Sequence, residues 1–138
     1  MISRKTQYGL KALSYLAKQP DNHPVLIADI SDEKKIPIKF LENILLDLRK
    51  AGLLESKKGK GGGYFFAIAP KKIKISTVIR ILDGPIALMP CVSLNFYKKC
   101  DDCDEKNCGL NHLMRDVRDA TLAVMDNRTV ADLAKMDV

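Results

Sequence analysis

An eight-residue basic and glycine-rich stretch, KKGKGGGY from Lys57 to Tyr64, restricts the fold of this chain more than any other feature. Four of its residues are glycines, which lose the most conformational freedom on folding and adopt positive φ angles readily. Two short segments lie on either side of it, LLES at 53–56 and YFFAI at 64–68. Two short strands joined by a flexible turn form a β-hairpin. We therefore expect a basic hairpin here, closed by Pro70.

Three helices are predicted before this hairpin. A dense apolar face between Lys5 and Lys18 predicts the first, and the segment VLIADISDEK at 25–34 predicts the second. Apolar residues at helical spacing predict the third at 37–50, with Pro37 as its first residue and Gly52 just past its end. Three helices followed by a hairpin is the order of a winged helix-turn-helix, in which the third helix lies in the DNA major groove.

The distribution of charge supports a polyanionic partner. Residues 1–80 contain 16 Lys and Arg against 7 Asp and Glu, a net charge of +9, whereas residues 81–138 contain 7 against 10, a net charge of −3. A basic half of this kind suits nucleic acid, although a generic basic surface is the simpler alternative. In the hairpin, Lys57, Lys58 and Lys60 can neutralise phosphates and so add affinity that does not depend on base sequence.

The predicted third helix also presents polar side chains that can read bases. Lys39 and Asn43 are four residues apart and share one face, with Glu42 beside them. Lysine can hydrogen-bond guanine, asparagine adenine, and glutamate the amino group of cytosine. For any one of the three residues, an ordinary solvated face of an amphipathic helix is an equally good interpretation.

The second half of the chain has a different pattern. Ser76 is predicted to cap a fourth helix that runs to Leu82, and an irregular loop is expected at 88–108. A long helix is predicted at 109–127, with apolar residues along one side. Thr129 with Asp132 three residues later resembles a capping box for a last short helix.

Four cysteines gather in the irregular loop with the pattern C-x8-C-x2-C-x4-C, namely Cys91, Cys100, Cys103 and Cys108. Thiolates bind zinc and iron–sulfur clusters, and the spacing alone favours the two about equally. A disulfide pair and a thiol oxidoreductase that uses Cys100 and Cys103 are weaker alternatives. His112 follows shortly after and could ligate, cap or pack.

No stretch of 18 apolar residues occurs, and the N-terminal segment lacks the apolar core of a signal peptide. We therefore expect a cytoplasmic protein with no membrane partner. In a reducing compartment, clustered cysteines are more often metal ligands than disulfides.

Taken together, these residues resemble the family of IscR-, NsrR- and CymR-type winged helix-turn-helix transcription regulators. The resemblance covers nearly the whole chain, and its carriers are highly specific in combination. They are FLENIL at 40–45, LRKAGL at 48–53, GGGY at 61–64, VIRILDGP at 78–85 and the cysteine loop.

The resemblance implies a mainly α fold with a small β-hairpin wing, a winged helix-turn-helix followed by a long C-terminal dimerisation helix. It divides the chain into a DNA-binding domain at 1–84, a cluster-binding loop at 85–108, and a dimerisation helix with a short C-terminal helix at 109–138. It also implies a homodimer on a near-palindromic site in double-stranded DNA. The contacts would come from Lys5 and Tyr8 on the first helix, Lys39, Glu42 and Asn43 on the third, and Lys58 in the wing.

The ligands of an iron–sulfur cluster follow only partly from the resemblance. Cys91 and Cys108 match two cluster cysteines of the family, and either Cys100 or Cys103 matches the middle one. Where one branch has a ligating histidine this chain has Asn111, and where another has a carboxylate it has Gln7. We therefore expect an all-cysteine site, of the 2Fe–2S or 4Fe–4S type.

These inferences predict a homodimeric DNA-binding transcription regulator, not an enzyme, whose promoter binding depends on an iron–sulfur cluster. A zinc-stapled DNA-binding regulator without redox sensing is the main alternative. An adaptor that kept the fold but lost its DNA affinity is a further one.

Overall fold

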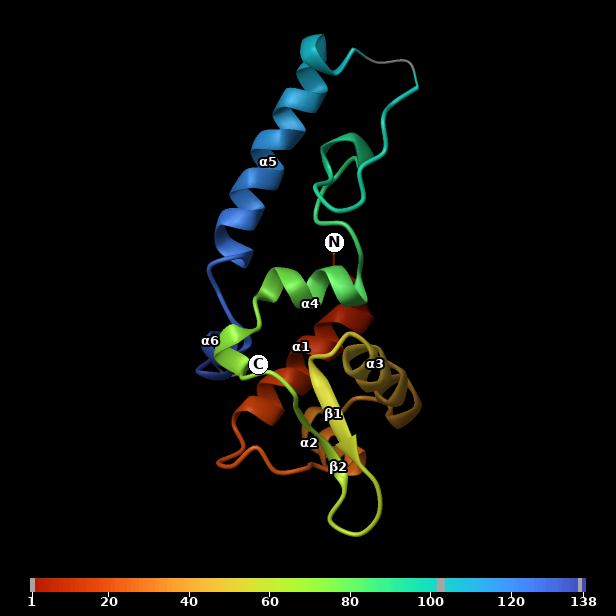
Figure 1. The fold of residues 1–138 in the computed structure, drawn as a ribbon, viewed down its shortest axis with the longest axis vertical. Coiled ribbons are helices and arrows are strands. Elements are labelled where there is room, and N and C mark those ends of the chain that lie inside the picture. Colours follow the sequence, from red (N-terminus) through yellow and green to blue (C-terminus); the bar gives the residue numbers. More distant parts are fainter. Residues whose placement is uncertain (1, 102–103, 137) are drawn as a thin grey trace.

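The structure is a computed structural model that describes residues 2–101, 104–136 and 138. Three helices come first, α1 (Arg4–Ala17), α2 (Ile27–Lys34) and α3 (Ile38–Lys50), followed by an antiparallel hairpin of β1 (Leu54–Lys57) and β2 (Gly63–Phe66). Helices α4 (Ile75–Leu82), α5 (Gly109–Met125) and α6 (Val130–Ala134) complete the chain, with 3-10 turns at Pro70–Lys72, Pro90–Val92 and Glu105–Asn107. The predicted fold class, mainly helical with a small hairpin, is confirmed (Figure 1).

The core lies between α1, α3, α4 and α6. Four leucine and isoleucine side chains of α3 follow helical spacing and are fully buried, as are two apolar residues of α1, whereas Ile38 and Phe40 of α3 are exposed. Helix α6 packs on α1 and brings Val130 into the same core, so the end of the chain closes the domain that its beginning opens. The fully buried apolar residues of α1 and α3 are Ala12, Leu13, Leu41, Ile44, Leu45 and Leu48.

The second helix begins later than predicted. Val25 lies outside α2 and forms an antiparallel bridge with Tyr64 of β2, with N–H···O distances of 2.9 and 2.8 Å. The apolar side chain of Val25 suits a helix and a strand equally well. The residue is extended because its backbone pairs with Tyr64 at the open edge of the hairpin. Helix α3 likewise begins one residue later than predicted, because Pro37 is its N-cap and not its first residue.

The prediction that Ser76 caps α4 is wrong. Lys74 is the N-cap, without a side-chain hydrogen bond, and the N–H of Ile75 donates to the carbonyl of Arg128 at 3.0 Å. A bridge between Lys74 and Thr129 thus satisfies the start of the helix. Ser76 is fully buried inside α4 and donates its hydroxyl hydrogen to Asp126. The capping box of Thr129 and Asp132 on α6 is confirmed.

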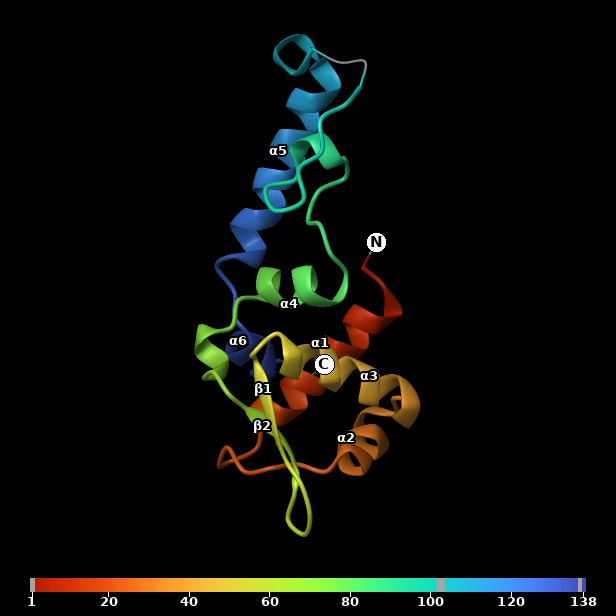
Figure 2. The ribbon, with the colours of Figure 1, turned by 45° about the vertical axis from the view of Figure 1, so that its right-hand side comes forward.

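Residues 86–101 and 104–125, here called the arm, extend away from this domain. The irregular loop runs out along α5, and α5 returns to the domain, as both ribbon views show (Figures 1 and 2). Arg118 of α5 donates to the carbonyl of Val92 at 2.8 Å and so ties the loop to the helix. The hairpin turn lies at the opposite end of the molecule (Figure 1).

Candidate nucleic-acid interface and cysteine site

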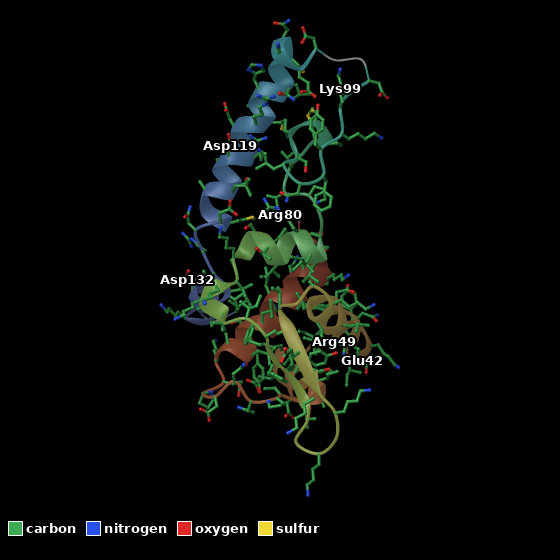
Figure 3. All side chains as sticks on the ribbon, viewed as in Figure 1. Glu42, Arg49, Arg80, Lys99, Asp119 and Asp132 are labelled. Atoms are coloured by element: carbon green, nitrogen blue, oxygen red, sulfur yellow. The ribbon has the colours of Figure 1, made fainter. Side chains whose placement is uncertain are left out.

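The third helix offers a polar face on the outside of the domain. Lys39, Glu42 and Asn43 are all exposed, because the apolar row on the other side of α3 holds the helix against the core. Figure 3 labels Glu42 and Arg49 on this helix. Arg49 donates from Nη1 to the Ser56 hydroxyl at 2.9 Å, which fixes the hairpin relative to the helix.

The hairpin presents its three lysines, Lys57, Lys58 and Lys60, to solvent. Gly63 begins β2 with φ +140°, and a Cβ placed there would lie 2.2 Å from the carbonyl oxygen of Val25. Glycine is therefore required at this position so that the Val25–Tyr64 bridge can form. The bridge holds the base of the hairpin, while Gly61, also at positive φ with open space around it, serves the turn.

The predicted contacts on the first helix lie beside α3. Lys5 pairs with Asp47 of α3, with 2.6 Å between Nζ and Oδ2, and both side chains are about one-third exposed. Tyr8 packs edge-on against Phe40, with ring centroids 5.5 Å apart, and the Arg4 guanidinium lies 5.7 Å from the Tyr8 ring centre. Because the Lys5 ammonium pairs with Asp47, it has less positive charge to offer to a phosphate.

At the far end of the arm, two of the predicted metal cysteines meet at one residue. The side-chain nitrogen of Asn111 lies 3.4 Å from the sulfur of Cys91, and its backbone nitrogen lies 3.4 Å from the sulfur of Cys108. Cys108 is the N-cap of α5, so the positive end of the helix dipole lies beside its sulfur. Cys91 and Asn111 are buried, whereas Cys108 is half-buried.

The other predicted ligands do not join this pair within the described residues. Cys100 is half-buried in the same loop, and Cys103 lies outside the described residues. His112 turns away, with Nε2 3.1 Å from the carbonyl oxygen of Lys106. Nowhere in residues 2–101, 104–136 and 138 do three Cys, His, Asp or Glu side chains gather closely enough to hold a metal ion. Two converging sulfurs with a buried amide beside them are nonetheless a donor set that suits a thiolate-bound metal or cluster.

Hydrogen bonds within the loop hold Cys91 in place. Lys98 donates from its backbone to the carbonyl of Pro90 at 3.1 Å, and Phe96 donates to the hydroxyl of Ser93 at 3.0 Å. The Tyr97 hydroxyl donates to Glu105, and this carboxylate raises the pKa of Tyr97. The hydrogen bond between Tyr97 and Glu105 joins the part of the loop that precedes Cys100 to the part that follows Asp104.

Comparison with known proteins identifies the family of this chain. Residues 2–136 match the Rrf2 family model, described as an iron-dependent transcriptional regulator. The chain belongs to the Rrf2 family. An rrf2-like HTH-type transcriptional regulator of Rhodobacter capsulatus is 41% identical to this Rrf2-family chain over 137 residues, which cover 96% of the chain and 91% of that protein.

Solved structures agree with the family assignment. CymR, the global cysteine regulator of B. subtilis, superposes with a TM-score of 0.80 at 31% identity, covering 98% of this chain and 96% of that one. IscR of T. potens superposes with a TM-score of 0.74 at 30% identity, covering 98% and 86%. This Rrf2-family protein is therefore a DNA-binding transcriptional regulator with a winged-helix fold, and the relatives that it matches are named as regulators, not as enzymes. None of the helices within the described residues is long and apolar enough to cross a membrane.

Residue-type reasoning missed three residues of these sites. Asn111 was recognised only as the place where a histidine ligand is lacking, although its position three residues after Cys108 is that of a helix N3 residue facing its cap. Asn22, which pairs with the edge of the hairpin, and Arg49, which ties the hairpin to α3, carry no signal in the sequence of this Rrf2-family chain that sets them apart.

Proposed function

We propose that this Rrf2-family regulator binds near-palindromic DNA as a homodimer, and that an iron–sulfur cluster in its cysteine loop modulates the binding. The convergence of the Cys91 and Cys108 sulfurs on Asn111 carries the proposal. It brings the two ends of the cysteine pattern together next to the first turn of α5. The family description as iron-dependent favours iron over zinc.

The DNA-facing part of the proposal rests on exposure and charge. The hairpin lysines Lys57, Lys58 and Lys60 are exposed at the end of the molecule farthest from the arm, where they can contact phosphates. The exposed α3 residues Lys39, Glu42 and Asn43 would then face base edges in the major groove. Lys5 and Tyr8 lie next to α3 and would reach the DNA backbone, with Lys5 first leaving Asp47.

Helix α5 supports the homodimer. Leu110, Leu113, Val117 and Val124 are between 38% and 55% exposed and lie on one face of the helix. Apolar side chains at this spacing on an isolated helix require a cover. The same face of a second copy would supply it, and two reading helices would then lie about 34 Å apart, one turn of DNA.

The contacts at the base of α5 provide a path from the loop to the DNA-binding domain. Ser76 inside α4 bonds Asp126 just past the end of α5, and the bridge between Lys74 and Thr129 follows directly. At its other end α5 is tied to the loop by Arg118 and Asn111. A change in the loop that favours another orientation of α5 would therefore shift the two reading heads relative to each other.

The cysteines Cys91, Cys100, Cys103 and Cys108 would hold the cluster. When bound, the cluster supplies a centre that gains or loses electrons and reacts with oxidants. Three residues of the chain would position it: Cys108 at the helix cap, Cys91 in the 3-10 turn, and the buried Asn111 between them. The loop with the cluster and the loop without it would favour different orientations of the arm. The difference in free energy between these preferences would set the size of the regulatory effect.

Anaerobic purification tests the proposal. We expect visible absorption with stoichiometric iron and sulfide and little zinc, and a change in affinity for native promoter fragments when the cluster is removed. A colourless zinc protein that binds DNA would favour the zinc-stapled alternative. Equal affinity of loaded and cluster-free protein on every promoter would contradict sensing but leave DNA binding intact.

A further inference from the structure

Asn111 is one of two residues in the described part of the chain with a buried side-chain polar atom that lacks a hydrogen-bond partner. It is 1% exposed, and its Oδ1 has no partner among the described residues. Leaving a buried amide oxygen unsatisfied destabilises the folded state. An apolar residue would avoid this cost, so stability does not explain an asparagine here.

What Asn111 does have is two sulfur neighbours that are distant from each other in sequence. Its Nδ2 donates to the sulfur of Cys91, twenty residues earlier, and its backbone N–H donates to the sulfur of Cys108, three residues earlier. Both are donors, which is the polarity that a thiolate requires. The reverse orientation of the amide would place an oxygen acceptor against an anionic sulfur and would be unfavourable.

We propose that Asn111 is a positioning residue of the metal site, donating one hydrogen bond to each of the Cys91 and Cys108 thiolates and holding the two ends of the cysteine loop together. The inference rests on the proposed function, since it assigns a role toward the metal held by the same cysteines. Residues that orient ligands by hydrogen bonding typically contribute about 10–100-fold to metal affinity. Donation to a thiolate also withdraws electron density from it, so the electronic spectrum of a bound metal reports the bond.

The test uses cobalt(II) as a probe with the anaerobic, cluster-free full-length protein and compares N111A, N111D and N107D. N111D keeps the shape of the side chain but removes its donor. Asn107 is exposed, and its amide contacts Asp104 instead of a sulfur, so N107D adds the same charge to the same loop. Circular dichroism and binding to nonspecific duplex DNA serve as folding checks.

We expect N111A and N111D to bind cobalt at least about 10-fold more weakly than wild type. Their sulfur-to-cobalt charge-transfer band should move to lower energy, and N107D should match the wild type in both respects. Wild-type affinity and spectra in both Asn111 variants would overturn the inference. Tight binding by N111D with weak binding by N111A would also overturn it, because Oδ1 would then be a direct ligand. Failure of the wild type itself to bind cobalt would contradict the metal site and hence the proposed function.

Discussion

Asn22 and the backbone of Phe66 exchange two hydrogen bonds: the Asn22 amide donates to the Phe66 carbonyl at 2.8 Å, and the Phe66 N–H donates to Asn22 Oδ1 at 2.9 Å. A side-chain amide thereby pairs with β2 as a third strand would. Together with the Val25–Tyr64 bridge it holds the outer edge of the hairpin.

Replacing Asn22 by alanine is expected to lower the free energy of unfolding by about 1 kcal/mol, because two hydrogen bonds at a partly solvated site are removed. Urea denaturation measures the change. N127A is the matched control, since Asn127 is exposed and its side chain donates only to the nearby carbonyl of Ala123. A wild-type midpoint for N22A would show that water replaces the side chain at no cost.

Two of the four hairpin glycines, Gly61 and Gly63, should respond differently to alanine. Both have positive φ, 74° and 140°, but only at Gly63 does a Cβ meet backbone, at 2.2 Å from the carbonyl oxygen of Val25. G61A should cost about 1 kcal/mol for the conformation alone, and G63A roughly 2–4 kcal/mol because the bridge must open. Thermal unfolding of the pair compares them. Equal losses of stability would mean that the Val25 contact does not constrain β2.

Neutralising the hairpin should weaken DNA binding without changing sequence preference. For K57A/K58A/K60A, the slope of log affinity against log salt should become shallower by about 0.9 for each phosphate that the hairpin no longer neutralises. Fluorescence anisotropy over a salt series, on specific and unrelated duplexes, measures the slope. K71A/K72A removes exposed lysines from the Pro70–Lys72 turn and controls for net charge. Unchanged affinity in the triple variant would favour an adaptor that does not bind DNA.

Charge on the exposed face of α5 should separate the protomers. L113E/V117E places two carboxylates on the apolar face and is expected to give a monomer by light scattering, because an interface cannot bury unpaired charges without a large penalty. Affinity for a palindromic site should fall more than affinity for a half-site. A123E adds a carboxylate to α5 away from that face and should remain dimeric. A dimeric double variant would show that another surface pairs the copies.

The capping box of α6 makes stability depend on pH. The backbone N–H and then the hydroxyl of Thr129 hydrogen-bond the Asp132 carboxylate, and they lower its pKa below the ordinary value of 3.8. A carboxyl with a lowered folded-state pKa stabilises the fold above its unfolded pKa and loses that effect as the pH falls through the folded one. The stability advantage of wild type over D132N should therefore be present at neutral pH and shrink below about pH 3.8.

Denaturation of wild type and D132N, at a series of pH values from neutral to below about 3.8, measures the difference in their stability. D116N, which removes an exposed carboxylate from α5, serves as the charge control. A difference that stays constant over this range would mean that the hydrogen bonds in the box do not depend on ionisation.

The sequence was sufficient for elements that local patterns define. The helical spacing of Leu41, Ile44 and Leu48 predicts α3, and the Thr129–Asp132 pair predicts the start of α6, because both signals depend on neighbours in the chain. Val25 and Ser76 were misassigned because their partners, Tyr64 and Asp126, are far away in sequence. From the sequence alone, a serine near the start of a helix is equally compatible with capping the helix and with donating a hydrogen bond inside the core. The contact of Ser76 with Asp126, fifty residues later, distinguishes the two.

The candidate sites show the same distinction between local signals in the sequence and contacts between distant residues. Composition is enough to find the hairpin lysines, and residue type is enough to find the cysteines. Which cysteines meet depends on how the loop closes, and the meeting of Cys91 and Cys108 at Asn111 needs contacts across twenty residues. A search by residue type selects the sulfur atoms but overlooks the amide between them.

The return of the chain from α5 to α6 has a consequence for how this regulator tolerates change. Because α6 buries Val130 beside α1, the arm is an insertion between segments that pack in one core, and it is not a tail attached to that core. Truncation from the carboxyl end would therefore damage DNA reading before it reached a single cysteine. Replacing residues 86–125 with a short linker is the deletion that the architecture accommodates, since both of its ends arrive at α4.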